Sequence, residues 1–205
     1  MKTFKQIFSM ALTAVLGAAV FVSCSTFSSG INFTKPEETK KLNDLISKAI
    51  TPDMLVQSIS FTYSNSSSFS LCKDKGEIIY VDPDNNTNVK GIDVDLKTGE
   101  CSENQWYKEH PRSGSMVQKG VNLNDFDFSK IADVVNAAVK VLGDEKITTN
   151  GIGSFAINFG WGDINQTKYV FTLQHRTGSQ QIGRTVRYTY NEYDFKADKD
   201  GNLVE

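Results

Sequence analysis

A helical spacing of apolar residues, followed by strands with alternating apolar residues, occurs twice in this chain. No other feature constrains its fold as strongly. The first helical pattern follows a capping-box pair, Thr34 and Glu37, and ends before Pro52. The second begins after residues 127–129 and ends at Gly143. The apolar positions are Leu42, Leu45, Ile46, Ala49 and Ile50 in the first, and Ile131, Val134, Val135, Ala138, Val139 and Leu142 in the second.

Each helical pattern leads into segments typical of antiparallel strands. These segments are 55–63, 76–83 and 88–100 in the first half, and 151–161, 167–175 and 184–202 in the second. The sequence therefore predicts an α+β fold of two tandem repeats, 34–105 and 125–205, joined by a linker over 106–124. Each repeat would be one helix packed on a three- to four-stranded antiparallel sheet. Because each is small for an independent core, we expect the two to pack together.

The two halves end alike. "DVDLKTGE" at 93–100 and "FKADKDGNLVE" at 195–205 both run from a strand into a glycine turn. Together with the repeated order of helix and strands, these endings resemble the PepSY-like domains and the β-lactamase-inhibitor-like fold. The resemblance implies a binder or inhibitor of secreted enzymes, without chemistry of its own. It carries no site residue onto this chain.

The N-terminal segment has the character of a secretory signal. Lys2 and Lys5 precede an apolar stretch over 7–22, which is shorter than a membrane-spanning helix requires. The stretch ends in Phe21-Val22-Ser23-Cys24, which resembles the lipobox of bacterial lipoproteins, here of the Bacteroidetes type, with phenylalanine in place of the usual leucine. The resemblance implies removal of residues 1–23, acylation of Cys24, and a tether over 24–33. An ordinary signal peptide or a single anchoring helix, with Cys24 a free thiol, is the alternative.

The residues after Cys24 bear on location. Ser25 stands where an aspartate would signal retention in the inner membrane, and no acidic run follows that would signal surface export. We therefore expect an outer-membrane lipoprotein that faces the periplasm. Without Lys2 and Lys5 the chain has 20 basic and 24 acidic residues, a net charge of −4. This balance argues against nucleic acid or an anionic membrane surface as a partner.

Two cysteines remain beyond the lipobox, Cys72 and Cys101. In an oxidising compartment a pair of cysteines is often bridged, so a Cys72–Cys101 disulfide is one prediction. Two isolated thiols are the alternative, since spacing alone does not bring two Cα atoms within about 7 Å.

Catalytic motifs are missing from the sequence. His110 and His175 are the two histidines, and the chain has no Gly-x-Ser-x-Gly, His-Glu-x-x-His or glycine-rich phosphate motif. A hydrolase would need one of these histidines buried beside a carboxylate or Cys72. We therefore expect a protein that is not an enzyme and holds no cofactor.

Residues 82–93 contain a candidate calcium loop. The oxygen-bearing side chains at positions 1, 3, 5, 7 and 12 of an EF-hand-like register are Asp82, Asp84, Asn86, Asn88 and Asp93. Thr87 replaces the glycine of such loops, and Asp93 is shorter than the usual bidentate glutamate. A turn between two strands explains the same residues, so the sequence favours no metal site.

Three aromatic residues are candidate contact residues. Trp161 lies between Gly160 and Gly162 at a strand end, and Trp106 and Tyr107 lie in the linker. Exposed aromatic side chains often anchor interfaces, whereas buried ones fill cores. The sequence thus favours a membrane-anchored periplasmic module that binds a protein or peptide through its sheet face. A carrier of small molecules or lipids is the alternative.

Overall fold

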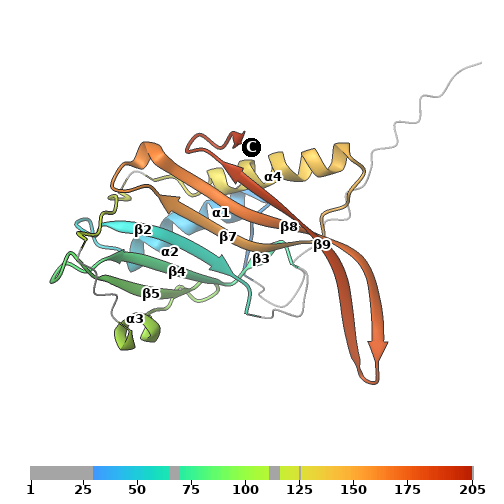
Figure 1. Ribbon diagram of the computed structural model, residues 1–205, viewed down its shortest axis with the longest axis horizontal. Helices are drawn as coiled ribbons and strands as arrows, with labels where there is room; N and C mark the ends of the chain where they lie inside the picture. The colour runs from blue at the N-terminus through green and yellow to red at the C-terminus, as the bar shows by residue number, and fades with distance from the viewer. Residues whose placement is uncertain (1–29, 65–69, 111–115, 125, 205) are drawn as a thin grey trace, which may run out of the picture.

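Eight strands form one continuous antiparallel sheet in the computed structural model, which describes residues 30–64, 70–110, 116–124 and 126–204 (Figure 1). The order across the sheet is β10-β9-β8-β7-β2-β4-β5-β6. The strands are β2 (Val56–Thr62), β4 (Lys75–Val81), β5 (Val89–Asp95), β6 (Cys101–Glu103), β7 (Gly151–Phe159), β8 (Thr167–Ile182), β9 (Thr185–Ala197) and β10 (Leu203–Val204). Two short strands, β1 (Ile31–Asn32) and β3 (Cys72–Lys73), form a separate pair.

The predicted fold of two helix-on-sheet repeats is wrong. Of the described residues, 42% lie in strands and 22% in helices, and the main strands of both halves belong to one sheet. The halves join where β2 pairs with β7, with Ile59 opposite Ile157 and Phe61 opposite Phe155. A separate sheet in each half would leave the backbone groups of β2 and β7 unpaired along an edge, and their pairing removes both edges.

Three helices cover one face of this sheet. They are α1 (Pro36–Thr39), α2 (Lys41–Ala49) and α4 (Lys130–Asp144). The buried apolar side chains of α2 and α4 share one core with the sheet, and α1 packs against these two helices. In Figure 1, α1 and α2 lie behind the strands. The short helix α3 (Gln105–Glu109) packs against β5, and a single 3-10 turn, η1 (Ile164–Gln166), precedes β8.

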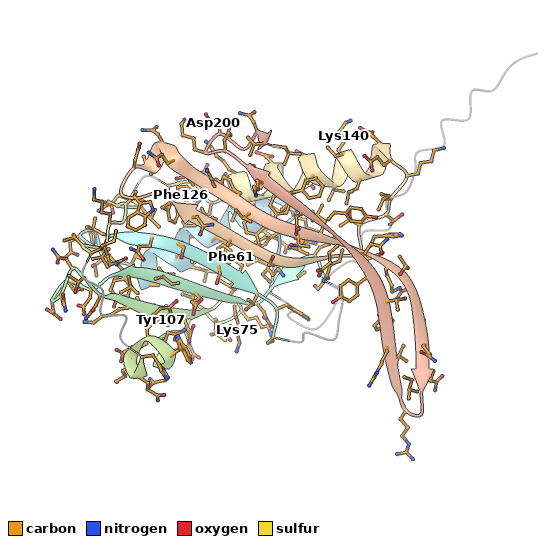
Figure 2. The ribbon with its side chains drawn as sticks, in the orientation of Figure 1. Phe61, Lys75, Tyr107, Phe126, Lys140 and Asp200 are labelled. Atoms are coloured by element: carbon orange, nitrogen blue, oxygen red, sulfur yellow. The ribbon has the colours of Figure 1, made fainter. Side chains whose placement is uncertain are left out.

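An aromatic cluster fills the centre of the core. Phe33, from the segment before α1, makes edge-to-face contacts with Phe61 and Phe155 at centroid distances of 5.1 Å each. Phe155 in turn stacks on Phe171 of β8 at 5.3 Å. Figure 2 labels Phe61 at the middle of the sheet. The space between the sheet and the helices is therefore filled by side chains.

A buried lysine ties β3 to the beginning of β7. The Nζ atom of Lys73 donates hydrogen bonds to the carbonyl oxygens of Ile152 (2.7 Å) and Gly153 (2.8 Å), where the pairing of β7 with β8 shifts register. Burial lowers the pKa of Lys73 from its ordinary 10.5 to about 8. Gly30 lies against the same residue with a left-handed φ of 92°, and a Cβ there would lie 2.1 Å from the Lys73 carbonyl oxygen.

The lowered pKa of Lys73 makes stability depend on alkaline pH. Below about pH 8 the ammonium is charged in both states, so the cost of burying it is fully present. Between about pH 8 and 10.5, Lys73 is protonated more fully in the unfolded chain than in the folded chain. The free energy of unfolding therefore rises with pH over this range. Relative to Lys73→Met, the wild-type protein should gain roughly 1–3 kcal/mol between about pH 7.5 and 10, measured by urea denaturation.

Lys140→Met is the control, because the Lys140 side chain is 77% exposed on α4. The difference between wild type and this variant should stay constant over the same pH range. An equally constant difference for Lys73→Met would contradict the prediction.

Candidate functional site

The face of the sheet opposite α1, α2 and α4, which we call the outer face, carries mainly small and polar side chains. Successive side chains of a strand point to opposite faces, and the core takes Ile59 and Phe61 of β2 and Phe155 and Ile157 of β7. The intervening side chains at the centre of the outer face are Ser58, Ser60 and Thr62 on β2, and Ser154, Ala156 and Asn158 on β7. Their small size leaves the middle of the sheet accessible between longer side chains on the flanking strands.

On the β4–β6 side, the outer face is acidic. A hollow of about 700 Å³ is lined by Ser60, Thr62, Lys75, Glu77, Asp93, Val94, Asp95, Glu100, Cys101 and Ser102. The side-chain amide of Asn104 donates to Glu77 (2.9 Å) and to Asp93 (3.0 Å), and the Ser60 hydroxyl donates to Glu77 (3.3 Å). The hollow is lined by four carboxylates and one lysine, so it favours the binding of a basic group. We call it the acidic hollow.

On the β8–β9 side, polar side chains of adjacent strands bond to one another. The hydroxyls of Ser154 and Thr172 lie 3.2 Å apart, and Thr172 donates to Asp194 (2.9 Å). Gln174 likewise donates to Glu192 (2.9 Å). These bonds hold the outer-face side chains in fixed positions.

Trp161 stands at one end of the outer face, just beyond β7, and its side chain is 64% exposed. It borders a hollow of about 280 Å³ lined by Gln57, Ser58, Gln118, Lys119, Asn158, Phe159 and Gly160. The Gln57 side chain donates to the side chain of Gln118 (3.1 Å) and to the carbonyl of Lys119 (3.0 Å). An exposed indole beside amide groups can anchor a partner, as the sequence predicts for Trp161.

The two aromatic residues of the predicted linker differ in exposure. Trp106 is 59% exposed, and its ring stacks on His110 at 4.1 Å. Tyr107 is buried, so the expectation that it lies in an exposed contact surface is wrong. Its ring occupies the space above Gly91 of β5, where a Cβ would come within 2.5 Å of it. Tyr107 therefore holds α3 on the sheet.

The predicted Cys72–Cys101 disulfide is not formed. Cys101 is a free, exposed thiol on the edge strand β6, paired opposite Val94. Cys72 is buried on β3, which belongs to the separate two-stranded sheet. The fold thus places the two cysteines in different sheets. Cys24, the predicted lipidation site, lies outside the described residues.

The residues of the candidate calcium loop do not converge. The ammonium of Lys90 lies 3.0 Å from Asp82 and 3.3 Å from Asp84, and so occupies the position between the first two carboxylates. Asp93 lies within β5, four residues after Val89 and therefore about 13 Å farther along the strand. The described residues contain no cluster of three or more His, Cys, Asp or Glu side chains arranged to hold a metal ion.

The two histidines contact backbone carbonyl oxygens. Nδ1 of His175 lies 2.7 Å from the oxygen of Thr148, and Nδ1 of His110 lies 3.1 Å from that of Trp106. Neither contact is with a carboxylate or with Cys72, as a hydrolase would need.

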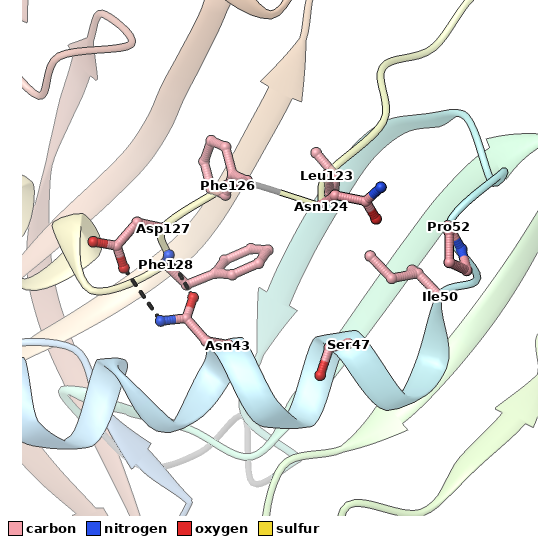
Figure 3. A pocket seen from close by; sticks show the side chains of 9 residues that line it. All are labelled: Asn43, Ser47, Ile50, Pro52, Leu123, Asn124, Phe126, Asp127 and Phe128. Atoms are coloured by element: carbon pink, nitrogen blue, oxygen red, sulfur yellow. Dashed lines mark hydrogen bonds between the residues drawn. The ribbon is translucent and has the colours of Figure 1, made fainter.

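A third hollow, of about 470 Å³, lies between α2 and the segment before α4 (Figure 3). Asn43 bridges it: its amide nitrogen donates to Asp127 (3.2 Å), and its amide oxygen accepts from the backbone N–H of Phe128 (2.9 Å). Bonds from Ser129 lower the pKa of Asp127. These polar groups fasten α2 to the segment before α4, which makes the hollow a weaker candidate site than the outer face.

No family model, curated protein or solved structure matches this chain. The resemblance to PepSY-like domains therefore stays a prediction. Within the ranges that the structure describes, no helix is long and apolar enough to cross a membrane.

The exposure of Trp161 predicts that its side chain contributes little to stability. Trp161→Ala should change the free energy of unfolding by no more than about 1 kcal/mol, whereas Phe33→Ala, at the centre of the core, should cost roughly 3–5 kcal/mol. Urea denaturation of both variants checks this. A loss for Trp161→Ala close to that of Phe33→Ala would place the indole in the core.

Proposed function

We propose that this protein is an envelope lipoprotein, anchored through Cys24, that binds a protein or peptide partner through the outer face of its sheet. The observation that carries the proposal is the outer face itself: its centre is small and polar, while α1, α2 and α4 all pack on the opposite side. Trp161 at one end and the acidic hollow at another give this face distinct contact points.

The chemistry of the outer face suits an extended chain with a basic residue. Hydroxyl and amide side chains such as Ser154 and Asn158 can donate to and accept from a peptide backbone. The carboxylates of the acidic hollow complement a lysine or arginine. Trp161 supplies a rigid apolar surface of the kind that concentrates binding energy in protein interfaces.

The core argues against the carrier alternative. A lipid carrier needs apolar space inside the protein, most simply between the sheet and its helices. Here Phe33, Phe61 and Phe155 fill that space in edge-to-face contact. We therefore favour a surface-binding module without catalysis, at the periplasmic face of the outer membrane.

Replacement of the anchor residue tests the location. Cys24→Ala should abolish acyl labelling and release the protein from the membrane fraction, because each buried methylene contributes about 0.8 kcal/mol to the attachment. Cell fractionation and labelling with a fatty-acid analogue measure both effects. A variant that stays fully membrane-bound and labelled would refute the anchor.

Site-specific photocrosslinking tests the binding face. A photoreactive phenylalanine analogue at Ser154 or Asn158, both exposed on the outer face, should give one adduct of defined mass in cells. Trp161→Ala should weaken that adduct severalfold. The matched control positions are Asp133 and Lys140, exposed on α4, which should give none. An adduct that forms from α4 and not from the outer face would contradict the proposal.

A further inference from the structure

The hairpin of β8 and β9 extends beyond the rest of the sheet. The pairing of β7 with β8 ends at Gln174, whereas β8 and β9 continue to pair as far as Ile182 and Thr185. Gly183, with a φ of 61°, begins the two-residue turn between them. Figure 1 shows this projection, residues 176–190, which we call the ribbon.

The ribbon has a composition unlike the rest of the chain. It contains three arginines, Arg176, Arg184 and Arg187, and no acidic residue. With −4 for the chain after the predicted cleavage and +3 for the ribbon, the remainder carries −7. The net charge of the whole chain is therefore the sum of two unlike parts, a basic ribbon and an acidic remainder.

Large apolar and aromatic side chains are also exposed on the ribbon. They are Ile182 (47%), Val186 (45%), Tyr188 (37%) and Tyr190 (48%). The guanidinium of Arg176 lies 5.3 Å from the ring centre of Tyr188. A two-stranded hairpin alone is marginally stable in water, so a ribbon with such side chains on its surface is suited to rest on a second surface.

The ribbon starts at the same end of the molecule as the described N-terminus. Gly30 lies against Lys73, and Lys73 donates to the carbonyls of Ile152 and Gly153. Residue Gly151 pairs with Gln174, two residues before the ribbon begins. A short series of direct contacts thus joins the first described residue to the base of the ribbon.

The reach of the ribbon matches that of the tether. Six residues lead from Cys24 to Gly30, and an extended chain spans at most about 3.5 Å per residue, or about 20 Å in all. Residues 178–182 of β8 add about 15 Å beyond the register shift at Gly178. An acylated Cys24 would therefore keep the ribbon tip within reach of the membrane surface.

We propose that the ribbon lies on the anionic phospholipid headgroups of the membrane that holds the anchor. This inference rests on the proposed lipid anchor. Each basic side chain at an anionic surface favours the bound state roughly fivefold, so three arginines give about a hundredfold. That preference is too small to recruit a free protein, yet it suffices to orient one that is already tethered. Tyrosine rings suit the interfacial region, where one edge is apolar and the hydroxyl is hydrated.

Limited proteolysis of the lipidated protein on vesicles tests the contact. The protein is reconstituted into vesicles of phosphatidylcholine alone, or with about 30% phosphatidylglycerol, and trypsin cleavage after Arg184 is timed. On the anionic vesicles this cleavage should be at least about tenfold slower. Cleavage after Lys146, exposed in the turn after α4, should be equal on both. At about 1 M salt the protection should vanish, because the screening length falls to about 3 Å.

Charge variants separate the ribbon from the rest of the surface. The double variant Arg176→Glu, Arg187→Glu keeps the cleavage site at Arg184 and should lose its protection on anionic vesicles. The matched control, Lys41→Glu with Lys48→Glu on the exposed side of α2, makes the same change of charge and should keep it. Unchanged cleavage after Lys146 in each variant shows that the fold is intact.

Flotation of the protein with the vesicles distinguishes failure of the ribbon from failure of the anchor. If the protein floats with phosphatidylcholine vesicles but Arg184 is cleaved equally on both kinds, the anchor stands and the ribbon inference is wrong. If the protein floats with neither kind of vesicle, the anchor is wrong, and the ribbon inference, which rests on the anchor, is overturned with it. If protection appears in detergent and rises with protein concentration, a second copy covers the ribbon and the lipid contact is overturned.

Discussion

The pairing of β2 with β7 is the interaction on which the rest of this structure depends. It joins strands that begin about 95 residues apart in the chain and places Phe61 directly opposite Phe155. Phe33 then packs on both rings from the helix side. The same pairing brings Ser60 beside Ala156 on the other side of the sheet. One contact thus creates both the centre of the core and the centre of the outer face. A change that weakens the pairing of β2 with β7 would therefore affect the stability of the protein and the geometry of the outer face together.

Local periodicity predicted the elements well and their assembly poorly. The spacing of apolar residues located α2 and α4, and the alternation in β2 and β7 assigned Ile59, Phe61, Phe155 and Ile157 to the buried face. Nothing in that alternation says which edge strand pairs with which, because the backbone groups of any two strands can pair. The extension of β8 was missed for a related reason: residues 176–182 are mostly polar, and their only described strand partner is β9. The register of a hairpin follows from its turn, here Gly183, rather than from an apolar pattern.

The candidate site was predicted in part. The error at Tyr107 had a readable cause, and Lys90 gave a readable reason to prefer a turn to the calcium loop. Gly91 within a strand is a signal of close approach, and the ring of Tyr107 fills the space that it leaves. Lys90, eight residues after Asp82, supplies the cation that a calcium ion would otherwise provide to Asp82 and Asp84. The separation of Cys72 from Cys101 had no such signal, because it depends on which sheet each short strand joins. The burial of Lys73 was equally hidden, since the acceptors of its ammonium lie about 80 residues away in the chain.

The distribution of charge connects the proposed anchor, the ribbon and the outer face. A basic ribbon on a body of charge −7 has a preferred orientation at an anionic surface, with the ribbon inward and the acidic hollow away from the headgroups. Alternate residues of β9 share a face, so Val186, Tyr188 and Tyr190 lie on the same side of the strand as Glu192 and Asp194 of the outer face. The β9 side of the outer face would then be the side nearer the membrane. A partner would approach from the β4–β6 side, where the acidic hollow lies. To bind a basic segment of that partner, the negative potential of the hollow must compete with that of the lipid headgroups. The carboxylates of Glu77 and Asp93, held in place by Asn104, are the groups positioned to do so.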